Sequence, residues 1–247
     1  MSGRAQGFTL MELLVALTIS SVLLTGLLQV VLAATSSFAL QQGLGQMQEH
    51  ARFLSAQLAD AIRPAGFHPQ PWTEPGAVSA VGVGSAEALS PAGDRLEVLR
   101  WSDRNCFDNP NPATDGNGMP LYHLRITRFE VISGQLVLNC RYGPDPASLV
   151  TQVNNLGLAG PVDAFEVQFA EDADADGQAE RWVAAGQWQH ETSLRAVRFA
   201  LVLATPERVQ GSATGPMQLF DASYTPADDG RLRRVYQGTV ALAGRLP

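Results

Sequence analysis

A single acidic side chain, Glu12, interrupts the longest apolar stretch of the sequence. It is the only charged residue between Arg4 and Glu49. A carboxylate placed in a membrane-spanning helix costs about 2.5–3.5 kcal/mol of insertion free energy. The isolation of Glu12 therefore predicts a partner of opposite charge, which neutralises the carboxylate inside an apolar environment.

A second set of carboxylates follows the spacing D-x-D-x-D-G-x-x-E. Its members are Asp172, Asp174, Asp176 and Glu180, with a glycine at position 177. Hard oxygens at alternate positions suit Ca²⁺, and a glycine lets the chain curl around the ion. The helix-loop-helix calcium motif also needs a bidentate Glu at its twelfth position, where this chain has Val183. The pattern thus indicates either a looser calcium loop or an acidic, solvated hairpin turn.

The two cysteines, Cys106 and Cys140, both follow the apolar stretch. Neither has a Cys or His neighbour at metal-ligand spacing, so we expect a structural disulfide rather than a metal site. If the apolar stretch anchors the chain, the later part lies on the periplasmic side of the membrane, where disulfides persist. A bridge that closes a loop of about 35 residues contributes roughly 3–4 kcal/mol on the chain-entropy model.

Composition and motifs favour a protein without catalytic activity. The four histidines are scattered, and the sequence has no Gly-x-Ser-x-Gly, phosphate-binding loop or dinucleotide fingerprint. The formal net charge is -7, which argues against a nucleic-acid groove. We therefore expect no enzyme and no nucleic-acid partner, with calcium as the one candidate cofactor.

These side chains must be positioned by one long helix and a β-rich domain. Residues 8–34 are long and apolar enough to span a bilayer. Residues 35–63 carry an apolar stripe at steps of four and three, and Pro64 ends the pattern. The sequence therefore predicts a helix over residues 8–63, roughly 80 Å long if unbroken. Residues 1–7 precede it as a short basic leader, and residues 64–247 form the globular head.

The head is expected to be a mostly antiparallel sheet. Strand-like runs cover residues 95–101, 121–132, 135–141, 162–170, 194–204 and 232–243. Ser133-Gly134 separates two of these runs and predicts a hairpin turn. The fold class is α+β, with the long N-terminal helix packed on the sheet.

The N-terminus resembles that of type IV prepilins, the precursors of pilus and type II secretion pseudopilus subunits. A short basic leader ends at Gly7, an aromatic residue follows at Phe8, and Glu12 is the fifth residue of the apolar run. The resemblance implies a type IV pilin fold, cleavage between Gly7 and Phe8 by prepilin peptidase, and N-methylation of Phe8. It also implies that Glu12 pairs with the α-ammonium group of a neighbouring subunit.

Three further segments are similar to PilW-type minor pilins. They are residues 58–67, which contain Ile62-Arg63 and Ala65-Gly66-Phe67, the strand and acidic turn at 167–177, and the last strand at 231–242. His68-Pro69 stands where many relatives place Gly-Cys, which leaves Cys106–Cys140 as the one possible bridge. This likeness implies a minor pilin that primes type IV pilus assembly, moves from the inner membrane to the pilus tip, and serves motility and adhesion.

The partners implied by the resemblance are other minor pilins, the major pilin, the inner-membrane assembly platform and a tip adhesin. Two other functions fit the same sequence. A type II secretion minor pseudopilin of the GspJ kind shares the N-terminus and the general fold. A tip-located binding module for DNA or a host surface belongs to a different functional class.

Overall fold

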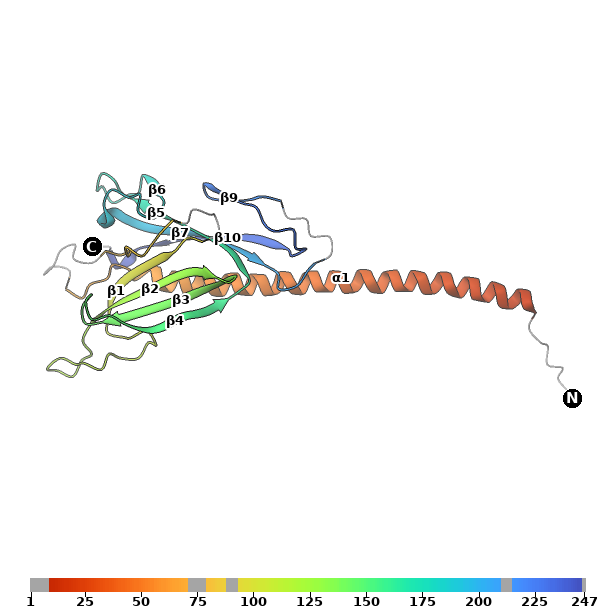
Figure 1. Ribbon diagram of the computed structural model, residues 1–247, viewed down its shortest axis with the longest axis horizontal. Coiled ribbons are helices and arrows are strands. Elements are labelled where there is room, and N and C mark those ends of the chain that lie inside the picture. Colours follow the sequence, from red (N-terminus) through yellow and green to blue (C-terminus); the bar gives the residue numbers. More distant parts are fainter. Residues whose placement is uncertain (1–8, 71–78, 88–92, 210–214, 246–247) are drawn as a thin grey trace. The chain divides into compact units, whose positions relative to one another are not determined.

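The computed structural model describes residues 9–70, 79–87, 93–209 and 215–245 (Figure 1). The chain forms two compact units, Met1–Gly45 and Gln46–Pro247. One helix, α1, runs from Leu10 to Ile62 and contributes residues to both units. Below, "the globular unit" refers to Gln46–Pro247.

Helix α1 is shorter than the predicted range 8–63: Thr9 precedes it and Arg63 follows it, and Phe8 lies outside the described residues. Pro64 accounts for the end of the helix, because a proline disfavours helical geometry in the residue before it. The helix side chains buried in the globular unit are Met47, Ala51, Leu54, Leu58 and Ile62. They recur at steps of four and three, so the predicted stripe is present, and Ile62 is its last buried member.

The globular unit contains ten strands among the described residues. They are β1 (Leu96–Ser102), β2 (His123–Ile132), β3 (Gln135–Gly143), β4 (Val150–Ala159), β5 (Val162–Glu171), β6 (Arg181–Val183), β7 (Leu194–Ala204), β8 (Met217–Leu219), β9 (Ala222–Tyr224) and β10 (Arg233–Ala241). Short 3-10 helices cover Glu191–Ser193 and Ala243–Arg245. Six of the strands match the predicted runs, whereas β4, β6, β8 and β9 were not expected.

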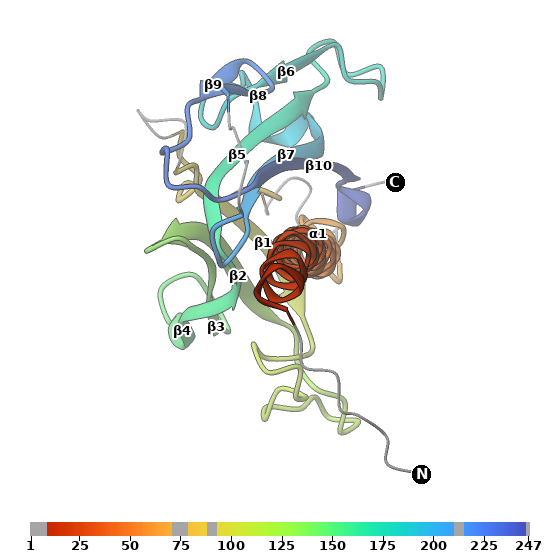
Figure 2. The same ribbon diagram turned by 90° about the vertical axis from the view of Figure 1, so that its right-hand side faces the viewer.

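The strands form two four-stranded antiparallel sheets and a small hairpin, where the sequence had suggested one sheet. The first sheet has the order β1-β2-β3-β4, and the second has the order β10-β7-β5-β6. Strands β8 and β9 pair only with each other. The two larger sheets form separate layers, and the chain passes from one to the other at the short connection between β4 and β5 (Figure 2).

The turn between β2 and β3 confirms the predicted hairpin. Ile132 pairs with Gln135, which leaves Ser133 and Gly134 as the two connecting residues. Both have positive φ angles, 51° and 74°, as a two-residue hairpin turn of type I′ requires.

Both sheets contribute to the core and to the surroundings of the helix end. The largest fully buried side chains include Phe129 from the first sheet and Phe165, Phe169 and Phe199 from the second. Backbone hydrogen bonds also fix the chain just after α1. The Gly66 amide donates to the Leu99 carbonyl of β1 at 2.7 Å.

The C-terminal segment holds the same helix end from another direction. The Gly244 amide donates to the carbonyl of Arg63 at 3.1 Å. A Cβ atom at position 244 would lie 2.6 Å from the carbonyl oxygens of Pro64 and Ala65, so this close approach requires glycine. The last turn of α1 is thus fixed by both β1 and the end of the chain.

Candidate functional site

The unit Met1–Gly45 presents an apolar helix surface. Its large apolar side chains from Leu10 to Phe38 are all at least 49% exposed. The helix contains a window with a mean hydropathy of 2.2, which is long and apolar enough to cross a membrane. A helix that is apolar on all sides suits lipid or a bundle of similar helices rather than water.

Glu12 lies in the first turn of this helix, next to a capping residue that the sequence analysis missed. The Thr9 side-chain oxygen accepts a hydrogen bond from the Glu12 amide at 3.3 Å. The Thr9 hydroxyl also donates to Glu12 Oε2 at 3.5 Å. The T-x-x-E spacing of a capping box signals this arrangement. Because a capping box needs only a Glu or Gln, capping alone does not explain a charged group here.

The two residues of the expected processing site, Gly7 and Phe8, lie outside the described residues. Three of the hydroxyl groups that follow in the apolar segment, those of Thr18, Ser21 and Thr25, donate to carbonyls of their own helix. Thr18 donates to Val15 O and Thr25 donates to Ser21 O, each at 2.8 Å. These groups are satisfied within the helix, so the carboxylate of Glu12 is the group in this segment that still needs a partner of opposite charge.

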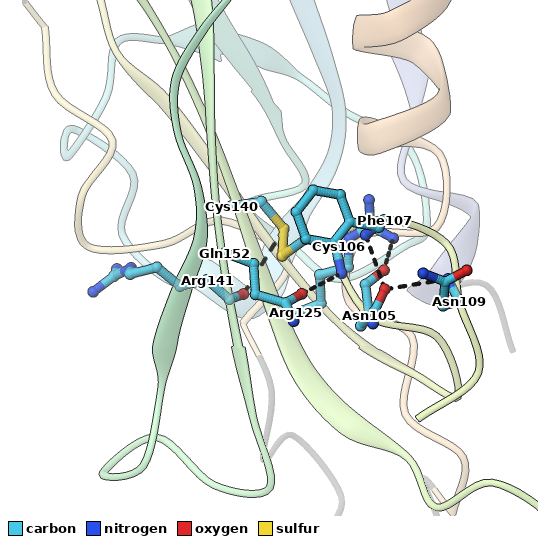
Figure 3. The surroundings of a disulfide bond; sticks show 8 residues. All are labelled: Asn105, Cys106, Phe107, Asn109, Arg125, Cys140, Arg141 and Gln152. Carbon is cyan, nitrogen blue, oxygen red and sulfur yellow. Dashed lines mark hydrogen bonds between the residues drawn. A yellow bond between two sulfur atoms is a disulfide. The ribbon is translucent and has the colours of Figure 1, made fainter. Parts of the chain in front are cut away.

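Cys106 and Cys140 form a disulfide, with a Cα–Cα distance of 5.9 Å (Figure 3). Cys140 belongs to β3, whereas Cys106 lies in the long connection between β1 and β2. The Cys106 amide donates to Oε1 of Gln152 on β4 at 3.0 Å, and Arg125 on β2 donates to the Asn105 carbonyl at 3.1 Å. The start of the long loop is thus attached to three strands of the first sheet.

Replacing both cysteines by serine is expected to destabilise the globular unit by about 2–4 kcal/mol, because the unfolded chain regains the entropy of a loop that spans 34 residues. The expected fall in Tm is roughly 4–16 °C at 2–4 °C per kcal/mol. Thermal unfolding of the detergent-solubilised chain, followed by circular dichroism, measures it. If reduction with dithiothreitol lowers the Tm of the wild type but not of the serine variant, the effect belongs to the bridge. Equal Tm values for the wild type and the variant would contradict the prediction.

The structure brings the four acidic residues of the sequence pattern together, in the connection between β5 and β6. One carboxylate oxygen from each of Asp172, Asp174, Asp176 and Glu180 lies within 4.8 Å of the others. Asp172 is buried and the other three are exposed. The flanking elements are strands rather than helices, as the sequence indicated.

Asp172 has a charged partner that the sequence could not reveal. Arg195 at the start of β7 donates to Asp172 Oδ2 from Nε at 2.8 Å and from Nη2 at 2.6 Å. Burial acts to raise the pKa of Asp172, but the hydrogen bonds from Arg195 and from the Gly177 amide, together with the charge of Arg195, outweigh it, and the pKa is lowered. Asp172 is therefore a buried carboxylate that stays ionised.

The preceding residue, Glu171, is also completely buried and was missed as a structural residue. Its Oε2 accepts from Arg181 Nε at 2.9 Å, and its Oε1 accepts from the amides of Gln189 and His190. Burial acts to raise the pKa of Glu171, but the Gln189 amide and Arg181 outweigh it, and the pKa is lowered. Glu171 and Asp172 thus attach the acidic connection to the segment that precedes β7.

Glu166 on β5 has the opposite electrostatic environment. It is 6% exposed, and no described residue donates a hydrogen bond to its carboxyl group. Burial raises the pKa of Glu166 to about 7, and the negative charges of Asp94, Glu87 and Asp221 add to the shift. The folded protein thus holds this proton more tightly than the unfolded chain, for which the reference pKa is 4.5. The contribution of Glu166 to stability falls as the pH rises from about 4.5 to about 7.

Glu166→Gln is therefore expected to raise Tm above pH 7 and to leave it unchanged near pH 4.5. The full shift corresponds to about 3 kcal/mol, and partial hydration reduces the expected gain to about 1–3 kcal/mol, or roughly 2–12 °C. Thermal unfolding scans between these pH values measure the difference from the wild type. Glu207→Gln, at an exposed position, is the matched control and is expected to give no such pH-dependent gain. A gain of equal size at both pH values would contradict the assignment to Glu166.

Comparisons with known proteins agree with this fold and with the N-terminal pattern. Residues 2–28 match the prokaryotic N-terminal methylation motif, and residues 132–243 match the family described as type IV pilus-assembly protein W, PilW. A solved structure, the type IV-like pilin TTHA1219 from Thermus thermophilus, is similar with a TM-score of 0.54 and 16% sequence identity. The similarity covers 82% of this chain and 98% of that one. A search of the curated proteins found no match.

The apolar helix, the antiparallel sheets and the methylation motif together define a type IV pilin-like protein. Within that class the chain is similar to the PilW family of pilus-assembly proteins, whose model matches residues 132–243. Proteins with this fold generally have structural rather than enzymatic roles.

Proposed function

We propose that the chain is a minor pilin that primes type IV pilus assembly and then remains at or near the tip of the filament. The precursor inserts into the inner membrane through residues 8–34, with the globular unit in the periplasm. Prepilin peptidase cleaves after Gly7, and the new N-terminus at Phe8 is methylated. The apolar helix then transfers from lipid into the bundle of helices at the filament core.

The observation that carries this proposal is the isolated carboxylate of Glu12 on a fully exposed apolar helix. In lipid this charge is a cost of about 2.5–3.5 kcal/mol. In a bundle of processed subunits, the α-ammonium group of a neighbouring Phe8 supplies the opposite charge. A buried pair of this kind adds little net stability, but an unpaired member is expensive, so the pair selects the correct axial register between subunits.

The partners follow from the same proposal. Prepilin peptidase acts on the leader, and the inner-membrane assembly platform receives the processed subunit. Other minor pilins form the priming complex with it, and the major pilin adds below that complex. A tip adhesin is a further candidate partner of the globular unit.

The test of processing is mass spectrometry of the intact protein and of its N-terminal peptide, purified from the native membrane fraction. A chain that begins at N-methylated Phe8 supports the proposal. A chain that begins at Met1, or that is cut elsewhere, removes its basis and leaves an anchored domain of another kind.

A deletion strain then decides which machine the protein serves. Loss of surface pili and of twitching motility, with exoprotein release unchanged, supports the pilus assignment. Loss of exoprotein release with normal pili instead supports a type II secretion pseudopilin, which shares the processed N-terminus.

A further inference from the structure

The connection between β5 and β6 carries more negative charge than the nearby basic residues neutralise. Among the described residues, one group of His, Cys, Asp or Glu side chains has the geometry to hold a metal ion. Its members are Asp172, Asp174, Asp176 and Glu180, whose candidate ligand atoms lie within 4.8 Å of one another. Arg195 offsets one of these four charges through Asp172. The remaining three repel one another unless a cation lies between them.

The three exposed carboxylates each use one oxygen to hold the loop and keep the other available. Asp174 Oδ1 accepts from the Asp176 amide at 3.2 Å, and Asp176 Oδ1 accepts from the Gln178 amide at 2.7 Å. Glu180 Oε2 accepts from the Ala173 amide at 2.6 Å. No described residue donates a hydrogen bond to the second oxygen of any of the three. Backbone amides of the loop thus hold it in place through one oxygen of each carboxylate. The second oxygens accept no hydrogen bond from the described residues.

The buried carboxylate supplies the independent observation. Asp172 is 1% exposed, and its Oδ2 is fully used by Arg195 and by the Gly177 amide at 3.0 Å. Its Oδ1 is also inaccessible to solvent, yet it has no hydrogen-bond partner among the described residues. A buried carboxylate oxygen without a partner is costly, and a bound ion is one of the few explanations for it. One of its two oxygens lies within 4.8 Å of a carboxylate oxygen of each of the three exposed residues.

We propose that the β5–β6 connection is a Ca²⁺ site. Its protein ligands are carboxylate oxygens of Asp172, Asp174, Asp176 and Glu180. An all-oxygen donor set with three or four negative charges suits Ca²⁺, which accepts irregular geometry and six to eight ligands. Mg²⁺ needs near-ideal octahedral geometry and prefers to keep its water, so this flexible loop selects against it.

The affinity is expected to be modest. Val183 replaces the bidentate Glu that closes the helix-loop-helix motif, so water completes the coordination sphere. Sites of this kind in extracellular modules have Kd values of about 10⁻⁴–10⁻³ M. Calcium outside the cytoplasm would occupy such a site, and it would tie the short edge strand β6 to β5.

The site has a built-in optical reporter for its test. Trp182 on β6 follows Glu180 by two residues, so it is close enough to sensitise the luminescence of Tb³⁺, which resembles Ca²⁺ in size and in preference for oxygen. With the full-length, detergent-solubilised chain, we expect Trp-sensitised Tb³⁺ emission that saturates at one equivalent and that Ca²⁺ displaces. Ca²⁺ at roughly ten times its Kd is also expected to raise Tm by about 3–6 °C, and Mg²⁺ at the same concentration is not.

The variant D174N/D176N keeps the side-chain oxygens that accept the loop amides but removes two charged ligands. It is expected to weaken Ca²⁺ binding at least tenfold and to leave the Tm measured without Ca²⁺ unchanged. The control D228N/E207Q removes two exposed charges elsewhere in the globular unit and is expected to bind like the wild type. The test extends to about 10 mM Ca²⁺, ten times the highest Kd of this class. If the wild type shows no saturable binding there, the connection is only an acidic hairpin turn. Equal binding by D174N/D176N and the wild type would also overturn the assignment.

Discussion

Glu12→Gln is expected to reduce the incorporation of the protein into pili by about a hundredfold or more. In the proposed filament, loss of the carboxylate leaves the α-ammonium group of the adjacent processed subunit buried without a partner. Breaking a buried ion pair in this way costs about 3–5 kcal/mol, which corresponds to a factor of roughly 10²–10⁴ in the assembly equilibrium. The measurement is the ratio of the protein in sheared filaments to that in the membrane fraction, by quantitative immunoblot.

This substitution separates assembly from the earlier steps. A neutral amide costs less than a charged carboxylate on insertion of the helix into lipid, so a loss of assembly is not a loss of insertion. Glutamine also replaces glutamate in a capping box, so the contact with Thr9 is kept. We therefore expect the variant to be present in the membrane at wild-type level and to be cleaved after Gly7.

The capping contribution has its own control. Thr9→Val removes the hydroxyl that accepts a hydrogen bond from the Glu12 amide, but it retains the carboxylate of Glu12. Loss of an N-cap costs about 1 kcal/mol, so a decrease in incorporation of less than about tenfold is expected. Incorporation of Glu12→Gln at the wild-type level, or an equal decrease for both variants, would contradict charge pairing as the role of Glu12.

The sequence predicted the helix and the most regular strands because continuous runs or stripes of apolar side chains mark them. Strand β5, in which nine of the ten residues are buried and only Asp163 is partly exposed, was predicted to within one residue. Strand β4 was missed because most of its residues are exposed and it carries no alternation of apolar and polar side chains. Its pairing with β3 is also irregular, and Asn155 has a positive φ angle of 49°.

The division into two sheets could not be predicted from local patterns. Strand β5 follows β4 after two residues, yet it pairs with β7 and β6 rather than with β4. Which strands pair depends on contacts between residues far apart in the chain. For the same reason Arg195, 23 residues after Asp172, could not be identified as the partner of that carboxylate.

The candidate sites differ in how much their own sequence reveals. Glu12 stands out because it is the one charge in a long apolar run, and its spacing from Thr9 could have revealed the capping box as well. The acidic connection is visible as a pattern, but the burial of Asp172 and its unpartnered Oδ1 arise only when β5 and β7 pack. A sequence pattern can thus name the ligands, whereas the case for an ion depends on burial.

The second large effect is expected at the junction of α1 with the sheets. Leu58 is completely buried, as are Leu54 and Ile62, one turn before and one turn after it. On one flank of this stripe, Gln57, Asp60 and Ala61 line a groove together with residues of β1 and β2, including Leu99 and Phe129. On the other flank, Ser55 and Ala59 line a groove with residues of β7 and β10, including Phe199 and Gly238. Since residues four apart lie above one another on a helix, Leu58 lies between the two sheets.

Leu58→Ala is therefore expected to destabilise the globular unit by about 3–5 kcal/mol. Both sheets and the helix would have to move to fill the cavity, so most of it remains empty. The corresponding fall in Tm is roughly 6–20 °C, measured by thermal unfolding of the detergent-solubilised chain with near-ultraviolet circular dichroism. Phe53→Ala removes a larger side chain from the same helix at a position that is 44% exposed, and it is expected to change Tm by only a few degrees. A similar loss for both variants would mean that helix propensity, rather than packing between the sheets, determines the stability of this segment. A large loss for Leu58→Ala alone would show that packing of the helix between the two sheets stabilises the globular unit.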